Sequence, residues 1–273
     1  MTRTAISPRL AIRIFFSTDD NIALVSQQNT NQSRKWHVTR VAETGSTNTD
    51  LLKSGADGAP DRTVLRADFQ SAGRGRLDRV WEAPPGANLL VSMLLREVPR
   101  HVHQLTQAVA LSAVQVARDT CGVEVTMKWP NDLLIGDVKV AGILAQAGRL
   151  DGTGVPEFVV VGLGLNIGWA PPGATCLADN RWSHPLSPDE FLHEMLPVVD
   201  AHLAMGSDDL HAAYLAGLST IGQRVRAEMH GDVHVIGRAV AVEPDGRLTI
   251  IDDCAVTHRI DTADVVHLRP HVD

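Results

Sequence analysis

Residues 73–81, GRGRLDRVW, combine three arginines, two glycines and a tryptophan in nine positions. Glycines let a backbone approach a ligand closely, and the planar guanidinium groups of Arg74, Arg76 and Arg79 suit carboxylate and phosphate oxygens. Trp81 could stack on a flat ring such as a nucleotide base. The segment is not a phosphate-binding loop of the GxxxxGKS/T kind, and it lacks the third glycine of a dinucleotide fingerprint. These nine residues also leave open a solvated basic surface loop.

A second polar group lies in KWPNDLLIGDVKVAGIL, residues 128–144. Pro130 ends a strand-like run because proline has no backbone N–H, so Asn131 and Asp132 are expected at a strand end. After a glycine turn, alternation places Lys139 on the face opposite its two valine neighbours. A solvent-facing lysine is the ordinary interpretation, and a lysine that meets an anion in a pocket is the alternative.

Two shorter polar groups have ordinary structural explanations when each is taken alone. The segment GSTNTD places Ser46, Thr47 and Asn48 at an expected helix start, where capping accounts for them. The segment GLGLN, residues 162–166, ends an apolar strand with Asn166, and a tight turn accounts for it.

Composition limits the class of protein. The chain has 273 residues and is 44% hydrophobic, enough for a large domain with a sizeable core and a small second one. Its formal net charge of −7 argues against a dedicated nucleic-acid binder. Cys121, Cys176 and Cys254 are far apart and odd in number, which indicates reduced, largely buried thiols in a cytoplasmic protein. No apolar run approaches the roughly 18 residues that span a bilayer.

Apolar periodicity predicts alternating strands and helices up to about residue 220. The helices include one from Ser46, one over about His101 to Thr120, and one that opens with Ser187 as N-cap, Pro188 and a capping box to Glu190. The expected strands are Trp36–Val41, Thr63–Asp68, Asn88–Leu95, Val123–Lys128, residues 138–144 and Phe158–Leu165.

Three regions follow from these patterns. Residues 1–35 are expected to be a poorly ordered extension, and residues 36–220 a layered domain of helices and strands. Residues 221–273 carry short alternating segments broken at Gly231-Asp232 and Asp245-Gly246, which are good hairpin turns, so a small β-barrel is expected there.

Taken together and in this order, the motifs resemble those of biotin protein ligases. The matching motifs are GSTN at 45–48, QSAGRGRxxRxW at 70–81, GANLLVSM at 86–93, KWPNDLL at 128–134, KVAGIL at 139–144 and GLGLN at 162–166. The resemblance is close over about residues 40–220. It implies an α+β catalytic domain with a mixed β-sheet flanked by helices, related in fold to class II aminoacyl-tRNA synthetases and lipoate ligases, and a small C-terminal β-barrel.

The resemblance implies a reaction in two steps. Biotin, the substrate, reacts through its carboxylate with the α-phosphate of ATP, with Mg2+, to give biotinoyl-5′-adenylate and pyrophosphate. A specific lysine on a biotin carboxyl carrier domain of a carboxylase such as acetyl-CoA carboxylase then displaces AMP. Cations near both anions would reduce their repulsion in the first step.

The resemblance also assigns roles to residues. Lys139 and Arg76 are implied to contact the biotin carboxylate and the phosphate, and Trp81 to stack near adenine. The implied biotin-binding residues are Ser46, Thr47, Asn48, Gln70, Gly73, Arg74, Arg76, Lys139 and Gly142. The implied ATP- and adenylate-binding residues are Arg76, Arg79, Trp81, Asn131, Lys139 and Asn166. No metal ligand from the protein is predicted.

Asp132 is a separate hypothesis, based on its place beside Asn131. The acceptor lysine must be neutral to react, whereas a free lysine has a pKa of about 10.4. We expect Asp132 to orient or deprotonate that lysine. Lys139, Arg76 and Asp132 are thus the predicted catalytic residues.

Related functions remain to be distinguished. A lipoate or octanoyl ligase would use related chemistry, although GRGRxxRxW with KWPND favours biotin. A biotin-responsive regulator is the non-enzymatic alternative. The 45 residues before Ser46 show no convincing three-helix pattern, so no operator DNA binding is expected, and an exposed sheet edge leaves open a homodimer.

Overall fold

The computed structural model describes residues 35–76, 79–180, 186–229, 233–261 and 264–267. Residues 35–273 form one compact unit. The expected extension over residues 1–35 and the turn at Gly231-Asp232 therefore lie, apart from Lys35, outside the described residues.

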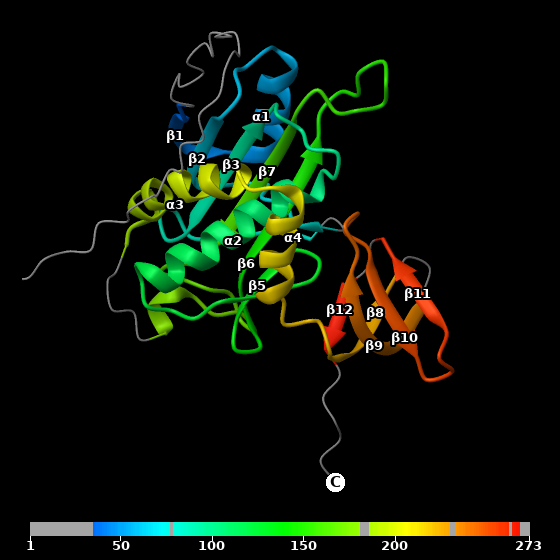
Figure 1. The fold of residues 1–273 in the computed structure, drawn as a ribbon. Coiled ribbons are helices and arrows are strands. Elements are labelled where there is room, and N and C mark those ends of the chain that lie inside the picture. The colour runs from blue at the N-terminus through cyan, green and yellow to red at the C-terminus, as the bar shows by residue number, and fades with distance from the viewer. Residues whose placement is uncertain (1–34, 77–78, 181–185, 230–232, 262–263, 268–273) are drawn as a thin grey trace, which may run out of the picture. The chain divides into compact units, whose positions relative to one another are not determined.

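A seven-stranded mixed sheet is the centre of this unit (Figure 1). Its strand order is β1-β2-β3-β7-β6-β5-β4, and β1 and β2 are parallel while the other neighbours are antiparallel. The strands are β1 (His37–Thr44), β2 (Thr63–Gln70), β3 (Leu89–Leu95), β4 (Thr126–Lys128), β5 (Asp132–Ile135), β6 (Val138–Ala147) and β7 (Val159–Leu165). The predicted α+β class is confirmed.

Helices cover both faces of the sheet (Figure 1). On one face, α1 (Thr47–Ala56) packs through Leu51 against Leu94 and Phe158. On the other face lie α2 (His103–Asp119) and α3 (Pro188–Leu203), with α4 (Ser207–Ala216) against α2. Every residue of β3 is buried, as expected for a central strand covered on both faces.

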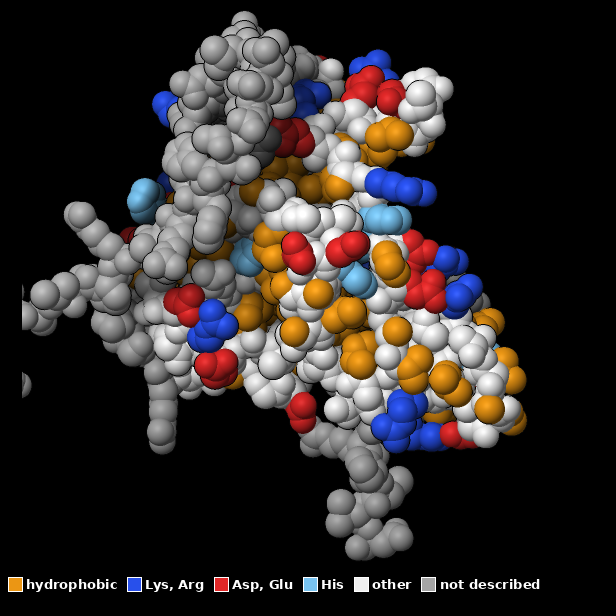
Figure 2. Space-filling model, viewed as in Figure 1, with side chains coloured by type: hydrophobic (Ala, Val, Ile, Leu, Met, Phe, Trp, Pro, Cys, Tyr) orange, Lys and Arg blue, Asp and Glu red, His pale blue; other side chains and the backbone are white. Residues whose placement is uncertain are grey.

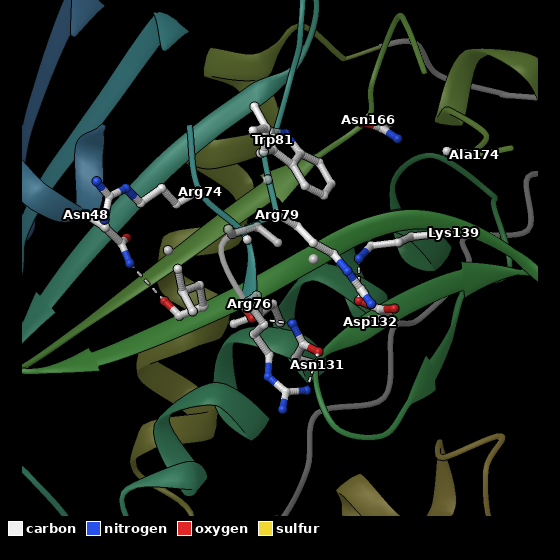
Figure 3. Close-up of a pocket in the computed structure, with 18 of the residues that line it drawn as sticks. Asn48, Arg74, Arg76, Arg79, Trp81, Asn131, Asp132, Lys139, Asn166 and Ala174 are labelled. Carbon is white, nitrogen blue, oxygen red and sulfur yellow. Dashed lines mark hydrogen bonds and ion pairs between the residues drawn. The ribbon is translucent and has the colours of Figure 1, made fainter. Parts of the chain in front are cut away.

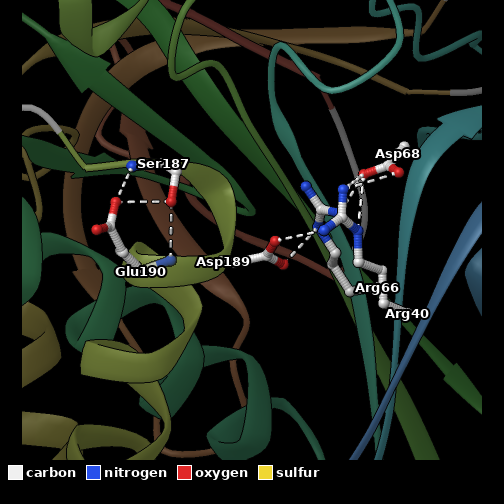
Figure 4. A network of polar contacts seen from close by, with 6 residues as sticks. All are labelled: Arg40, Arg66, Asp68, Ser187, Asp189 and Glu190. Atoms are coloured by element: carbon white, nitrogen blue, oxygen red, sulfur yellow. Dashed lines mark hydrogen bonds and ion pairs between the residues drawn. The ribbon is translucent and has the colours of Figure 1, made fainter.

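An ion-pair network fastens the first turn of α3 to β1 and β2 (Figure 4). The guanidinium of Arg40 lies 2.9 Å from Asp68 and 3.0 Å from Asp189, and buried Arg66 pairs with both carboxylates. Burial would raise the pKa of Asp68, but Arg40 and Arg66 outweigh it and hold that pKa below its usual value. The predicted capping box between Ser187 and Glu190 is present beside this network.

The C-terminal strands form a separate antiparallel sheet, in the region where a small β-barrel was predicted. They are β8 (Arg224–Glu228), β9 (His234–Val242), β10 (Leu248–Asp252), β11 (Thr257–Ile260) and β12 (Asp264–His267), in the order β11-β10-β9-β8-β12. Among the described residues this order is linear, with β11 and β12 at its two ends. The predicted turn at Asp245-Gly246 joins β9 to β10, and Gly246 has a φ of +91°.

Some local predictions differ from the structure. The strand predicted to start at Val123 starts only at Thr126, because the N–H of Val123 donates to the Ala117 carbonyl at the end of α2. Cys121 and Cys176 are buried as expected, whereas Cys254 is exposed.

The surface carries charged side chains of both signs, as the counts of 25 basic and 32 acidic residues lead one to expect. On the face shown in Figure 2, charged side chains of both signs lie interspersed with hydrophobic ones. Among the described residues, the helices are all too short or too polar to cross a bilayer.

Candidate active site

The predicted site residues converge on a cavity of about 410 Å3. It lies over β2, β3, β7 and β6 on the face that α1 covers, and the turn after β4 completes one wall. Figure 3 labels side chains around it that come from α1, from the loop of residues 73–81, from the turn after β4, and from β5 and β6. The predicted residues that line it are Thr47, Asn48, Gln70, Arg74, Arg76, Arg79, Trp81, Asn131, Asp132, Lys139, Gly142 and Asn166.

The GSTN motif supplies a polar end to the cavity. Ser46 is the N-cap of α1 and is buried, and it is absent from the described lining. Thr47, the next residue, faces β2, where Gln70 Oε1 accepts from the Thr47 N–H at 2.7 Å and its hydroxyl at 3.0 Å. Ser46 therefore holds the N-cap position without a capping hydrogen bond from its side chain, while Thr47 and Gln70 form the polar surface.

Ser92 extends this polar end, and the sequence interpretation missed it. Its hydroxyl donates to Asn48 Oδ1 at 2.6 Å and lies 2.7 Å from Thr47 Oγ1. Asn48 Nδ2 in turn donates to the Leu144 carbonyl and to Gln146 Oε1. The available signal was a serine within the otherwise apolar run LLVSMLL. The structure buries it fully, and a buried hydroxyl requires a polar partner.

Glycines in β7 and β6 make room for larger side chains. Gly164 lies opposite Gly142 in the sheet, and the Trp81 ring rests on both, such that a Cβ on Gly164 would come within 2.4 Å of the ring. A Cβ on Gly162 would come within 2.2 Å of Asn48 Oδ1. The GLGLN glycines are therefore strand residues that admit side chains, not a tight turn.

Trp81 also carries an unused donor. Its Nε1 is buried and has no hydrogen-bond acceptor among the described residues. Lys139 Nζ lies 5.7 Å from the centre of the Trp81 ring, within the range of a cation–π contact. A ligand acceptor in the cavity would satisfy the indole N–H.

The GRGRLDRVW segment folds back on itself as a hairpin-like loop. Arg74 pairs with Val80 in an antiparallel bridge, and the Trp81 N–H donates to the Gly73 carbonyl at 3.0 Å. A Cβ on Gly73 would come within 2.4 Å of the Trp81 carbonyl, so glycine is required there, although Gly73 is outside the described lining. Leu77 and Asp78 lie outside the described residues.

The loop arginines are distributed along the cavity. Arg76 Nη1 donates to Asn131 Oδ1 at 3.3 Å, which joins the loop to the turn after β4. In Figure 3, Arg74 extends toward Asn48 and Arg79 toward Asp132 and Lys139. A linear anionic ligand in the cavity would therefore meet guanidinium groups along its length.

Lys139 and Asp132 form the central ion pair. Lys139 Nζ lies 2.6 Å from Asp132 Oδ1, and both side chains line the cavity. The pairing of β5 with β6 changes register at Leu133 and Leu134, so Lys139 lies opposite Leu134 and Asp132 lies opposite Gly142. Of the two interpretations of Lys139, the structure supports the lysine in a pocket.

Asn166 occupies a more structural position than predicted. It is buried, its Oδ1 accepts from Asn88, and its Nδ2 donates to the Thr175 carbonyl. These bonds hold the chain that follows β7 against the cavity wall formed by Pro171 and Ala174. A contact of Asn166 with a nucleotide stays a prediction.

Comparison with known proteins identifies the family. Residues 41–166 match the sequence pattern of the biotin/lipoate A/B protein ligase family. A biotin–[acetyl-CoA-carboxylase] ligase of Mycobacterium tuberculosis is 37% identical over 84% of this chain and 88% of its own length. A second biotin–[acetyl-CoA-carboxylase] ligase, from Paracoccus denitrificans, is 33% identical over 77% of this chain and 96% of its own length.

A solved structure shows the same fold. The biotin protein ligase of Aquifex aeolicus, in complex with biotin and ATP, superimposes with a TM-score of 0.72 at 22% identity, over 85% of this chain and 99% of that one. Fold, site and sequence thus define a ligase of the biotin and lipoate type. From its curated relatives, the chain belongs to the biotin protein ligases.

Proposed function

We propose that this protein activates biotin with ATP to biotinoyl-5′-adenylate and then transfers biotin to a lysine of a biotin carboxyl carrier domain. One observation carries the proposal. A single cavity has a polar end at Thr47, Gln70 and Ser92, bordered by Arg74, and a cationic wall that includes Arg76 and Lys139. This arrangement fits a molecule with a neutral polar head and a carboxylate tail.

The polar end suits the ureido group of biotin. That group has two N–H donors and one carbonyl acceptor, and the polar end offers hydroxyl and amide groups that can serve both roles. Gln70 Oε1 and Thr47 Oγ1 are already oriented by each other, so little ordering is needed when a ligand binds. Gly142 leaves room beside Trp81 and Lys139 for the tail.

The cationic wall suits the first half reaction. A carboxylate oxygen of biotin attacks the α-phosphorus of ATP, the bond between that phosphorus and the bridging oxygen to the β-phosphorus breaks, and pyrophosphate leaves. Lys139 and Arg76 reduce the repulsion between the two anions and stabilise the charge that develops in transfer. Arg79 and Trp81 border the same space and bind the nucleotide end.

The second half reaction needs a neutral amine. The acceptor lysine nitrogen attacks the acyl carbon of the adenylate, the bond from that carbon to the phosphate oxygen breaks, and AMP leaves while the amine loses a proton. Asp132 lies beside the expected position of the acyl phosphate through its contact with Lys139. We assign Asp132 the role of orienting the amine or accepting its proton.

Magnesium would enter with the phosphates of ATP. Among the described residues no group of three or more His, Cys, Asp or Glu side chains is arranged to hold a metal ion. Mg2+ keeps several waters and binds substrate phosphates readily, so a dedicated protein site is not required. When bound, it would neutralise part of the phosphate charge.

The setting of the reaction is also part of the proposal. We propose that the enzyme works in the cytoplasm, where ATP is available. The net charge of −7 disfavours DNA as a partner. The largely exposed edge strand β1 is the element we propose for pairing in a homodimer, to be tested by analytical ultracentrifugation.

The decisive test is the mass of an acceptor domain. The purified protein, with ATP, Mg2+, biotin and a biotin carboxyl carrier domain, should add the mass of one biotinoyl group. A Lys139→Ala variant should lose the addition, while Lys53→Ala, at an exposed position on α1 outside the described cavity lining, should keep it. A lipoyl mass, or biotin binding without any addition, would contradict the proposal.

A further inference from the structure

The C-terminal sheet contacts the segment that leads into Asn131 and Asp132. The indole Nε1 of Trp129 donates to the Gly246 carbonyl at 2.9 Å, in the turn between β9 and β10. Trp129 is 3% exposed. The turn fits closely at this point, because a Cβ on Gly246 would come within 2.9 Å of the His103 ring on α2.

The linker between α4 and β8 holds the same segment from another side. The Met127 N–H donates to the Gly217 carbonyl at 3.0 Å, and the Ser219 N–H donates to the Met127 carbonyl at 2.7 Å. The Trp129 N–H donates to Thr220 Oγ1 at 3.0 Å, and Thr220 is fully buried. The strand end before Pro130 is therefore fixed by the chain that leads into the C-terminal sheet and by a turn of that sheet.

The residues just beyond this strand end face the charged part of the cavity. Asn131 accepts from Arg76 and donates to the Ile143 carbonyl at 2.8 Å, and Asp132 pairs with Lys139. By contrast, Thr47 and Gln70, at the polar end, bond to each other, and among the described residues neither makes a hydrogen bond to the C-terminal sheet. The two ends of the cavity are thus supported by different parts of the chain.

We propose that Trp129 is a positioning residue that couples the C-terminal sheet to the nucleotide half of the site. Its bond to Gly246, together with the Thr220 bond to its backbone, sets the position of Asn131 and Asp132 and hence of Arg76 and Lys139. The inference rests on the proposed function and deepens it. The ATP-dependent step depends on this contact, whereas the binding of biotin alone does not.

The main variant removes one hydrogen-bond donor and keeps an aromatic side chain, although a smaller one. Trp129→Phe is compared with Trp36→Phe, because the Trp36 Nε1 also donates a hydrogen bond, to Asp200 at 2.8 Å, outside the described cavity lining. Four quantities are measured for each variant: the Kd of biotin without ATP, the KM of ATP and the kcat in biotin-dependent ATP–pyrophosphate exchange, and the Tm.

We expect Trp129→Phe to lower kcat/KM for ATP by about tenfold, the effect of about one lost buried hydrogen bond, while biotin Kd stays within about twofold. Trp36→Phe should leave the kcat/KM for ATP and the Kd of biotin at their wild-type values, even if its Tm falls as much as that of Trp129→Phe. A Trp129→Phe enzyme with wild-type exchange, or one whose biotin affinity falls in parallel, would overturn the inference.

A second pair of variants, both at Thr220, distinguishes the proposed coupling from a simple folding defect. Thr220→Val removes the acceptor for the Trp129 N–H with little change in shape, whereas Thr220→Ser keeps the hydroxyl. The valine variant should reproduce the selective loss in exchange and the serine variant should restore it; equal kinetics for the two would count against the coupling. Wild-type protein without any exchange would overturn the proposed function and this inference together, whereas active wild type with unaffected variants overturns the inference alone.

Discussion

Lys139 and Asp132 carry the opposite charges that the two half reactions need. The first half reaction brings two anions together, and the second brings in the cationic side chain of the acceptor lysine. Their ion pair at 2.6 Å places one charge of each sign at the same point of the cavity wall. Both side chains are partly exposed, so the pair itself contributes little to stability. Its arrangement is better explained by the chemistry than by the fold.

Replacement of the carboxylate should separate the two steps. Asp132→Asn keeps the shape and leaves Lys139 free to meet the biotin carboxylate, so adenylate formation should stay within about threefold of wild type. Single-turnover transfer from preformed adenylate to a carrier domain should fall by about 100-fold, at the lower end of a general-base contribution. Intact transfer with reduced adenylate formation would show that the assigned role is wrong.

Gly164, under the Trp81 ring, should be as important for binding the adenylate as any charged residue of the site. Gly164→Ala places a Cβ within 2.4 Å of the indole and must displace it from the cavity wall. The affinity for the adenylate, measured by calorimetry with a non-hydrolysable analogue, should fall by about tenfold or more, a change of about 1.4 kcal/mol. Gly152→Ala is the control, because nothing lies within 4 Å of its Cβ; equal affinity of the two variants would contradict the packing argument.

Residue types were predictable from the sequence where an unusual side chain interrupted a pattern. Lys139 between valines left a pocket open as the alternative to solvent, Asn131 after Pro130 was expected at a strand end, and both line the cavity. Ser92 and the packing roles of Gly162 and Gly164 were missed, because their importance depends on which residue lies opposite them. Gly162 lies opposite Ser92 and Gly164 opposite Gly142, and such partners across strands depend on register, which a single sequence does not reveal.

Among the elements, the hairpin-like loop of residues 73–81 carries the greatest concentration of like charge over the site. Arg74 and Arg79 are exposed. Ligand anions would neutralise these guanidinium groups and favour closure of the loop, which would exclude water from the adenylate.

Loop closure predicts protection from a protease. Trypsin should cleave the free protein near Arg76, and biotin with ATP should slow that cleavage by about tenfold or more, because only a locally opened segment fits a protease site. Rates are followed by mass spectrometry, with cleavage at the exposed Arg149, which follows β6, as the internal reference. Equal rates near Arg76 with and without both ligands would exclude closure.

Element boundaries followed the local signals closely where those signals were strong. Ser187, Pro188 and Glu190 start α3 as expected, since a capping box acts within one turn. The start of β4 was predicted three residues too early, because Val123 and Val125 are buried and β-branched but pack at the end of α2. The register change beside Lys139 also had no local signal, as it arises from pairing between strands.

For the molecule as a whole, the junction of α2 with the β9–β10 turn contains a titratable group held neutral. Burial and the nearby His101 and His211 lower the pKa of His103 to about 4, against the opposing effects of Asp245 and the Pro244 carbonyl. Gly246 packs directly on this ring. A positive charge on His103 would therefore disfavour the junction that we propose to position Asn131 and Asp132.

The pH dependence of stability follows from that lowered pKa. Between about pH 4 and 6.5 the unfolded chain binds this proton and the folded chain does not, so the stabilisation is present above pH 6.5 and is lost as the pH falls toward 4. Urea unfolding should show a loss of roughly 2 kcal/mol from this group between about pH 7 and about pH 5, an upper value because His103 is only partly buried. His103→Gln should remove that part of the slope, whereas His37→Gln, at an exposed position on β1, should keep it. Burial also lowers the pKa of His202, but this group contributes equally to the pH dependence of stability in both variants. An unchanged slope in His103→Gln would therefore show that the junction does not hold a neutral histidine.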